Sequence, residues 1–358
     1  MLVLGAGASF GARREEPRPP LGKQLASYLL GWFDANAPQD GDYEWAHAME
    51  YELDGTAPPD RLYDGDPDVR PILERAVERS RSSDTGFEDV MDEVMREPSG
   101  SRAGLERLNE VLAISLLGGR ACAFERKTDL YDELFSLLCP RLRSIITPNY
   151  DVLAEEALER IGLTYRYGGT RYADMQYGIP QESGEADVVL YKFHGSANWF
   201  QVSGTGGKAQ MAKPLRAVPQ TRIPSFYNDQ ALYPARPREN AFLEHKREGM
   251  PPIMVTYGPG KDALHGRPYL DAVREACAAD LAKPEPRRII SLGISPPRGQ
   301  GDDEAWEQLC KVFSALGSAK EYWSGALNER AAMVAHGFEP RAGWFDDLLA
   351  ALRTATSA

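Results

Sequence analysis

Short apolar segments that end in glycine-rich or polar turns recur along this chain and alternate with segments of helical periodicity. The apolar segments are residues 2–4, 143–151, 187–199, 251–258 and 287–295. Strands that alternate with helices in this way predict an α/β fold, here a Rossmann-like parallel sheet flanked by helices. We expect a single domain over residues 1–358. The first apolar segment is very short, and we expect the fold or its gene to begin a few residues upstream.

Two long stretches interrupt the alternation. Residues 21–142 contain apolar residues at helical spacing, as in 21–33 and 84–97, and we predict a mainly helical insertion there. Residues 201–250 are rich in glycine, proline and basic residues, which predicts a loop-rich excursion. After residue 300 the pattern indicates two helices around a strand at 319–323.

The composition excludes several classes of function. The formal net charge is −12, which argues against direct nucleic-acid binding or an anionic membrane surface, since both require a basic face. No apolar run approaches the ~20 residues of a membrane span, and the first residues lack the layout of a signal peptide. We therefore expect a soluble, cytoplasmic protein.

The four cysteines are Cys122, Cys139, Cys277 and Cys310, and they form no CxxC pair. This spacing is not typical of a zinc site or of a disulfide framework. We expect buried free thiols in a reducing compartment, and no metal site.

Four polar clusters follow four of the predicted strands. They are Gly5–Ser9, Thr147–Asp151, His194–Ser196 and Gly293–Ser295. In parallel α/β sheets, ligands bind at the carboxyl ends of the strands. The sequence therefore predicts one composite site built from all four clusters.

The first cluster lies in "LGAGASFG", where small residues follow an apolar strand. Glycines allow backbone N–H groups to approach a pyrophosphate, and a following helix N-terminus favours the anion. The usual dinucleotide fingerprint is G-x-G-x-x-G, whereas Phe10 occupies its third glycine position and Gly11 comes one residue late. A plain tight turn remains the alternative.

The second cluster, "TPNYD", places Asn149 and Asp151 two residues apart at a strand end. Side chains at i and i+2 of an extended segment project to the same side, so an amide and a carboxylate would address one ligand together. The alternative is that both residues cap the helix that follows.

The third cluster contains His194, one of only five histidines in the chain, directly before Gly195. Histidine is the natural general base near neutral pH. An ordinary buried or loop histidine is the alternative.

Taken together and in this order, "GAGAS", "TPNYD", "FHGS" and "LGIS" resemble the motifs of the sirtuin (silent information regulator) superfamily. Sirtuins carry a GAG-x-S turn, a TQN-x-D turn, a histidine-glycine pair and a late G-x-S turn. The resemblance implies a sirtuin-like domain whose glycine segment holds the pyrophosphate of NAD.

The chain also departs from the sirtuin deacylases. It lacks their two zinc-binding CxxC pairs and their G-I-P-x-F-R segment, and Pro148 stands where they carry glutamine. With its helical insertion and the closing segment "GFEPRAGWFDDLL", it resembles the prokaryotic sirtuin-like NAD hydrolases of antiviral defence. The resemblance implies a toxic effector that depletes NAD and halts the infected cell (abortive infection).

The resemblance also implies roles for individual residues. Asn149 would position the ribose and the attacking water, Asp151 would bind the nicotinamide carboxamide, and His194 would accept a proton. The remaining NAD contacts would come from Gly5, Ala6, Gly7, Ala8, Ser9, Thr147, Tyr150, Gly195, Gly293 and Ser295. NAD would be a substrate, with no metal required.

Other functions remain open at this point. A deacylase or an ADP-ribosyltransferase would break the same bond but use a different acceptor, and a non-catalytic NAD or ADP-ribose sensor is a further possibility. The resemblance to defence hydrolases implies control by homo-oligomerisation or by a separately encoded partner, an ATPase or an Argonaute-type protein.

Overall fold

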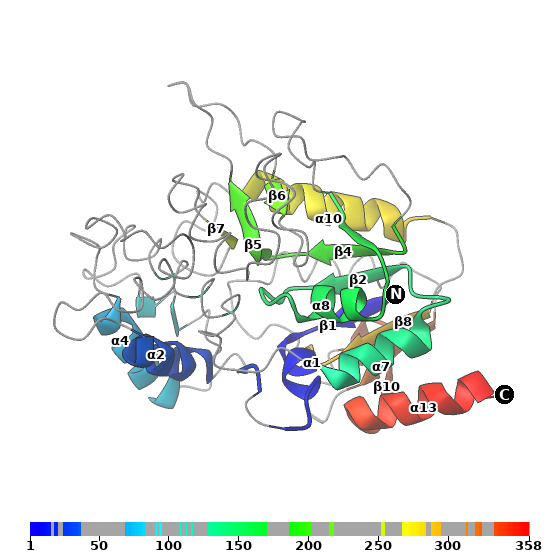
Figure 1. Ribbon diagram of the computed structural model, residues 1–358, viewed down its shortest axis with the longest axis horizontal. Coiled ribbons are helices and arrows are strands. Elements are labelled where there is room, and N and C mark those ends of the chain that lie inside the picture. The colour runs from blue at the N-terminus through cyan, green and yellow to red at the C-terminus, as the bar shows by residue number, and fades with distance from the viewer. Residues whose placement is uncertain are drawn as a thin grey trace, which may run out of the picture.

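The computed structural model describes the parts of the chain that build the predicted sheet and its covering helices (Figure 1). The described residues are 1–15, 18–20, 24–36, 69–82, 90–91, 93–94, 108, 112, 116, 128–169, 186–201, 215–217, 252–254, 267–283, 288–294, 313, 319–323 and 333–357. Ser295, Cys122, Cys310 and most of the predicted 201–250 excursion lie outside them.

The core of the fold is a seven-stranded parallel sheet, which confirms the predicted Rossmann-like α/β architecture. Its strand order is β10-β9-β8-β1-β2-β4-β3. The strands are β1 (Leu2–Leu4), β2 (Ser144–Thr147), β3 (Tyr165–Tyr167), β4 (Val188–Lys192), β8 (Arg288–Leu292), β9 (Ala319–Trp323) and β10 (Glu339–Arg341). The central strands are rich in Leu, Ile and Val and are buried on both faces, as parallel strands between two helical layers are.

The direction in which the chain winds reverses at β1. From β1 the chain adds β2 and β4 on one side, and later β8 and β9 on the other. In open α/β sheets this reversal marks the crevice where ligands bind. The four predicted polar clusters follow β8, β1, β2 and β4, which are consecutive neighbours in the sheet, and so all four reach the same edge.

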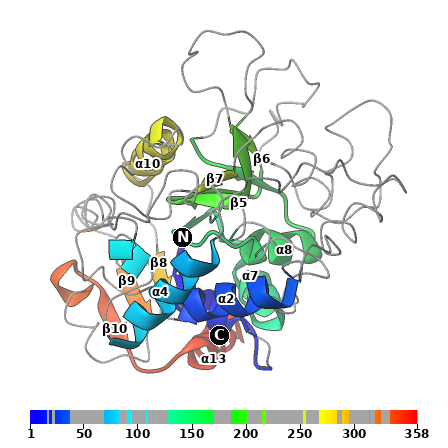
Figure 2. The same ribbon diagram turned by 90° about the vertical axis from the view of Figure 1, so that its left-hand side faces the viewer.

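Helices cover both faces of the sheet. Helices α7 (Asp129–Leu138) and α8 (Leu153–Arg160) lie on one side, and α10 (Arg267–Leu281) lies on the other (Figure 2). Helix α7 buries Leu130, Tyr131, Leu134 and Phe135, a spacing that places one apolar stripe against the core. Helix α13 (Phe345–Ser357) packs beside α7, where Tyr131 meets Phe345 at a ring-centroid distance of 5.8 Å.

One prediction about the strands is wrong. Residues 187–199 form two strands rather than one, because the chain turns at Phe193 and His194 and Gly195 adopts a φ of 84°. The second part, β5 (Gly195–Gln201), leaves the parallel sheet. It pairs antiparallel with β6 (Leu215–Ala217) and β7 (Pro252–Met254) in a separate three-stranded sheet.

The same sheet corrects two neighbouring predictions. The strand predicted within 251–258 exists as β7, but it belongs to the small antiparallel sheet rather than to the parallel one. The predicted loop-rich stretch 201–250 includes the strand β6.

The sequence analysis also missed β3 and β10, because each has only three residues and a partly exposed pattern.

The described parts of residues 21–142 are mostly helical. They include α2 (Leu25–Asn36) and α4 (Arg70–Ser82), which pack against each other. Val90, Met91 and Val94 are helical and buried while Glu93 is exposed, which fits the predicted amphipathic stripe. The last helix of this stretch, α7, covers the parallel sheet.

The cysteine prediction is only partly correct. Cys277 is buried on α10, whereas Cys139, which directly follows the last residue of α7, is exposed. Within the described ranges, no helix is long and apolar enough to cross a membrane.

Candidate functional site

The glycine segment after β1 is a strand-to-helix junction rather than a plain tight turn. Gly5 precedes α1 (Ala6–Gly11), so the motif itself forms the helix. The Gly5 N–H donates to the Leu292 carbonyl at 3.0 Å and the Gly7 N–H donates to the Gly293 carbonyl at 2.9 Å. These two N–H groups are therefore already hydrogen-bonded to the end of β8.

The glycines at this junction are required by the close approach of two backbones. A Cβ on Gly5 would lie 2.3 Å from the Gly293 oxygen, and a Cβ on Gly293 would lie 2.1 Å from the Ala8 nitrogen. Gly293 also has a φ of 62°, a conformation that L side chains rarely adopt. The first and fourth predicted clusters are thus in direct contact.

Gly11, which comes one residue later than the last glycine of the dinucleotide fingerprint, has a packing role of its own. A Cβ on Gly7 would lie 3.1 Å from the Trp344 ring, and a Cβ on Gly11 would lie 2.5 Å from Trp344 Nε1. Residues four apart share one face of a helix. The Trp344 indole therefore covers the face of α1 that carries both glycines, which explains why a glycine stands at position 11.

Ser9 joins the first and second clusters. Its hydroxyl donates to Asp151 Oδ2 at 2.8 Å and accepts from Asn149 Nδ2 at 2.9 Å. The Tyr131 hydroxyl lies 3.3 Å from the same oxygen. Since the only Ser9 hydroxyl hydrogen is given to Asp151, Tyr131 is the donor in that third contact. Burial raises the pKa of Tyr131 well above its usual value, with Asp151 adding to the effect, so this donor keeps its proton.

Both hydrogens of the Asn149 amide are used. Besides Ser9, Nδ2 donates to the Gly5 carbonyl at 3.0 Å, and the Asn149 N–H donates to Thr147 Oγ1 at 3.0 Å. A planar amide held by two such bonds has a fixed orientation. The asparagine thus locks the β2 turn onto the glycine segment.

Asp151 serves two purposes. Its Oδ2 accepts the Ser9 hydrogen bond, and its Oδ1 accepts the Leu153 N–H at 3.1 Å at the start of α8. Val152 is the N-cap residue of α8, so Asp151 lies one position before the cap while its carboxylate also faces the shared cluster.

Backbone contacts hold the third cluster against the second. The Phe193 N–H donates to the Thr147 carbonyl at 3.0 Å, and the Ala197 N–H donates to the Tyr150 carbonyl at 2.9 Å. The His194 and Tyr150 rings lie 5.9 Å apart between centroids. His194 is buried and contacts the residue that stands between Asn149 and Asp151.

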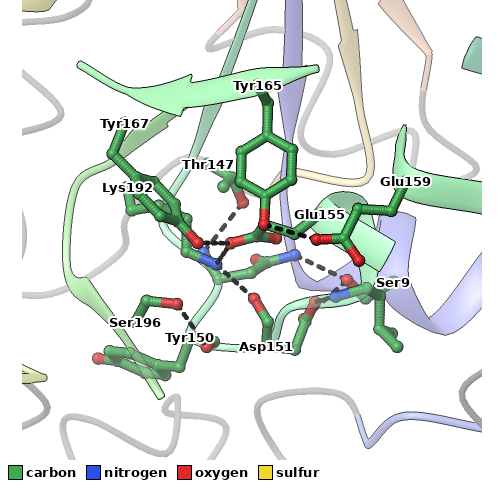
Figure 3. Close-up of polar contacts among 12 residues, drawn as sticks. Ser9, Thr147, Tyr150, Asp151, Glu155, Glu159, Tyr165, Tyr167, Lys192 and Ser196 are labelled. Atoms are coloured by element: carbon green, nitrogen blue, oxygen red, sulfur yellow. Dashed lines mark hydrogen bonds and ion pairs between the residues drawn. The ribbon is translucent and has the colours of Figure 1, made fainter. Parts of the chain in front are cut away.

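A buried charged cluster supports the turn that carries these residues (Figure 3). Lys192 Nζ lies 3.1 Å from Glu155 Oε1 and donates to the Asp151 carbonyl, and the Tyr167 hydroxyl donates to Glu155 at 3.1 Å. Burial raises the pKa of Glu155, while the Lys192 charge opposes that rise.

The structure thus brings together most of the residues predicted for the site. Those in contact or directly adjacent are Gly5, Ala6, Gly7, Ala8, Ser9, Thr147, Asn149, Tyr150, Asp151, His194, Gly195 and Gly293. Ser295 lies outside the described residues.

Sequence reasoning missed Tyr131, Lys192 and Glu155. Lys192 carried a detectable signal, because it is a charged residue within an otherwise apolar strand. Tyr131 and Glu155 lie on helices of ordinary amphipathic pattern and gave none.

The side chains at this edge provide hydrogen-bond donors and acceptors of several kinds. A hydroxyl, an amide, a carboxylate and an imidazole are the groups that hydrogen-bond to ribose, carboxamide and water. Among the residues that the structure describes, no three His, Cys, Asp or Glu side chains are grouped to hold a metal ion.

Comparison with known families points to the same part of the chain. Residues 143–245 match the family model described as a SIR2-like domain. This stretch contains Thr147–Asp151 and His194, whereas the glycine segment and Gly293 lie outside it. Comparison with curated proteins gives no match. The match supports the resemblance to the sirtuin-like superfamily, whose domains use NAD.

Proposed function

We propose that this chain hydrolyses NAD at the bond between nicotinamide and ribose, releasing nicotinamide and ADP-ribose. The observation that carries the proposal is the Ser9 network. It holds Asn149 and Asp151 in fixed orientations beside Tyr150, on which the His194 ring packs. These residues fall at the ends of neighbouring strands, and all of them except Ser9 lie in the stretch that matches a SIR2-like domain.

The reaction breaks a carbon–nitrogen bond and needs no redox step. The bonding electron pair leaves with the nicotinamide nitrogen, which becomes neutral, and the ribose passes through an oxocarbenium-like state. A water oxygen then bonds to the anomeric carbon, and its proton leaves through His194. The products are nicotinamide, ADP-ribose and one proton.

The proposed roles follow from the hydrogen-bonding groups of each side chain. The Asn149 amide is fixed through its two N–H groups, so the direction of its Oδ1 acceptor toward ribose or water is fixed as well. The Asp151 carboxylate would accept from the nicotinamide carboxamide. Gly5, Ala6, Gly7, Ala8 and Ser9 would line the pyrophosphate, but not through the N–H groups of Gly5, Gly7 and Ala8, which already donate to backbone carbonyls. The residues Thr147, Tyr150, Gly195, Gly293 and Ser295 would complete the NAD site.

The test is direct. Purified protein is incubated with NAD, and nicotinamide and free ADP-ribose are followed by chromatography. We expect Asn149→Ala and His194→Ala to bind NAD in calorimetry but to lose about 10²–10⁴-fold in turnover. His336→Ala is the matched control, because His336 also precedes a glycine with positive φ, Gly337, but lies in the turn before β10.

Other results would reassign the activity. Wild-type protein that binds NAD without any turnover would make the chain a sensor. ADP-ribose recovered on a protein acceptor, or turnover that requires an acylated peptide, would make it a transferase or a deacylase.

We further propose that the activity serves as the toxic effector of an antiphage system and is restrained before infection. The restraint would come from homo-oligomerisation or from a separately encoded ATPase or Argonaute-type partner. Cells that carry the gene with its neighbours are challenged with phage while NAD is measured, and the purified protein is sized by chromatography. A lone monomer with constitutive activity contradicts this proposal.

A further inference from the structure

Lys192 has a charged side chain that is buried in the folded protein. Its side chain is 1% exposed, and the side chain of its partner Glu155 is 0% exposed. It lies at the last position of β4, two residues before His194. Nothing in the proposed chemistry uses this residue, so its burial requires another explanation.

The lysine connects three elements that meet beneath the site. From β4 its Nζ reaches the Asp151 backbone carbonyl in the turn after β2 and the Glu155 carboxylate in the first turn of α8. Tyr167 of β3 donates to the same Glu155 oxygen. Figure 3 shows the Lys192 side chain beside the Glu155 carboxylate and the Tyr167 hydroxyl, with Asp151 adjacent.

Stability alone does not account for such a pair. Removing two charges from water is unfavourable, and the replacement of a buried ion pair by apolar residues of similar volume is often neutral or stabilising. The geometry offers a different role. A long side chain anchored in β4 holds a backbone carbonyl of the turn that carries Asn149 and Asp151, while the same strand end carries His194.

We propose that Lys192 is a positioning residue: it fixes the turn of Asn149 and Asp151 relative to His194 by holding the Asp151 carbonyl, with Glu155 as its buried counter-ion. This inference rests on the proposed NAD hydrolysis, since that reaction requires the three side chains to address one bond. A misplacement of about 1 Å in such a constellation costs about 10²-fold in rate.

The decisive variant replaces the pair without leaving an unpaired charge. For Lys192→Met/Glu155→Leu we expect the urea midpoint of unfolding to fall only modestly, because no buried charge is left unpaired although the Tyr167 hydroxyl loses its acceptor. We expect kcat for NAD to fall about 10–10²-fold while KM changes less than about threefold. The matched control is Arg288→Met/Glu321→Leu, which removes the ion pair between β8 and β9 and should leave kcat within about twofold.

Hydrogen exchange provides a readout that does not depend on activity. Peptides covering residues 147–153 should exchange faster in the Lys192→Met/Glu155→Leu variant than in the wild type, with little change in peptides from β8. Wild-type kcat in the double variant, or wild-type exchange in this segment, would overturn the proposal. If this double variant does not fold, Lys192→Met/Glu155→Gln, which keeps an uncharged acceptor for the Tyr167 hydroxyl, is measured with the same two criteria.

The two proposals fail in different ways. If the wild-type protein shows no NAD turnover, the proposed function is wrong, and the exchange of residues 147–153 still decides whether Lys192 holds the turn. If the wild type is active and the double variant is equally active, only the positioning role is wrong.

Discussion

The Ser9 hydroxyl donates a 2.8 Å hydrogen bond to Asp151 Oδ2, although 142 positions separate the two residues in the sequence. The bond joins α1, which follows β1, to the turn that follows β2, and these two strands are adjacent in the sheet. Ser9 is also the shared partner of Asn149 and Tyr131, so its oxygen makes one donated and two accepted hydrogen bonds. One hydroxyl thereby orders the amide and the carboxylate of the candidate site.

Ser9→Ala should impair activity more than stability. The substitution leaves Asp151 Oδ2, Asn149 Nδ2 and the buried Tyr131 hydroxyl without their common partner, which costs about 1–3 kcal/mol of unfolding free energy. We expect kcat/KM for NAD to fall about 10–10²-fold as the amide and carboxylate lose their alignment. Ser136→Ala is the control, because the Ser136 hydroxyl is exposed and donates to the Asp132 carbonyl within α7. Equal activity of the two variants would contradict the role of Ser9.

Gly293→Ala should disrupt the contact between the ends of β1 and β8. Its φ of 62° is strained for alanine, at about 1–3 kcal/mol, and its Cβ would also lie 2.1 Å from the Ala8 nitrogen. Gly162→Ala is the matched control, since Gly162 has a φ of 78° but a Cβ added there would meet no atom within 4 Å. Chemical denaturation should show a larger loss for Gly293→Ala. Similar losses would mean that the backbone contact contributes little.

Gly11→Ala and Gly31→Ala should change stability in opposite directions. Alanine is favoured over glycine in helices by about 0.8–1.0 kcal/mol, and Gly31 of α2 has open space around it. The same substitution at Gly11 places a methyl group 2.5 Å from Trp344 Nε1, so the indole must shift off α1. Thermal melts should therefore show a higher Tm for Gly31→Ala and a lower Tm for Gly11→Ala. A higher Tm for both would show that the indole yields without penalty.

The pairing of β3 with β4 should weaken in acid. Asp187 Oδ2 accepts from the Thr164 N–H at 2.8 Å and from the Thr164 hydroxyl at 2.7 Å, and these bonds lower the Asp187 pKa below its ordinary 3.8. A carboxyl whose pKa is lower in the folded state contributes stability above its unfolded pKa and loses it as the pH falls through the folded value. Asp187→Asn should therefore reduce the unfolding free energy at about pH 7, and the deficit should be smaller at a pH well below the ordinary pKa of 3.8. An equal deficit at both pH values, in urea titrations, would assign the effect to something other than the charge.

Much of the architecture followed from the sequence because its signal is local. Apolar runs such as those at Ile145 and Ile290, each ended by a polar or glycine turn, predicted parallel strands, and the shared edge predicted that the four clusters would meet. The break at His194 was not predictable in the same way. The residues before and after it are equally strand-like, and only the pairing of β5 with β7 takes the second half into another sheet.

The candidate site, like the fold, could be predicted from the sequence only in part. The order of amino acids is enough to tell which chemical groups stand at the strand ends: the Asn149 amide, the Asp151 carboxylate and the His194 imidazole. How these groups are held depends on the folded chain, because the Tyr131 and Ser9 hydroxyls, the Lys192–Glu155 pair and the contact of Gly5 with Gly293 join segments remote in the sequence. Periodicity and motif spacing describe neighbours along the backbone, whereas hydrogen bonds and steric contacts depend on distances that exist only after the chain has folded.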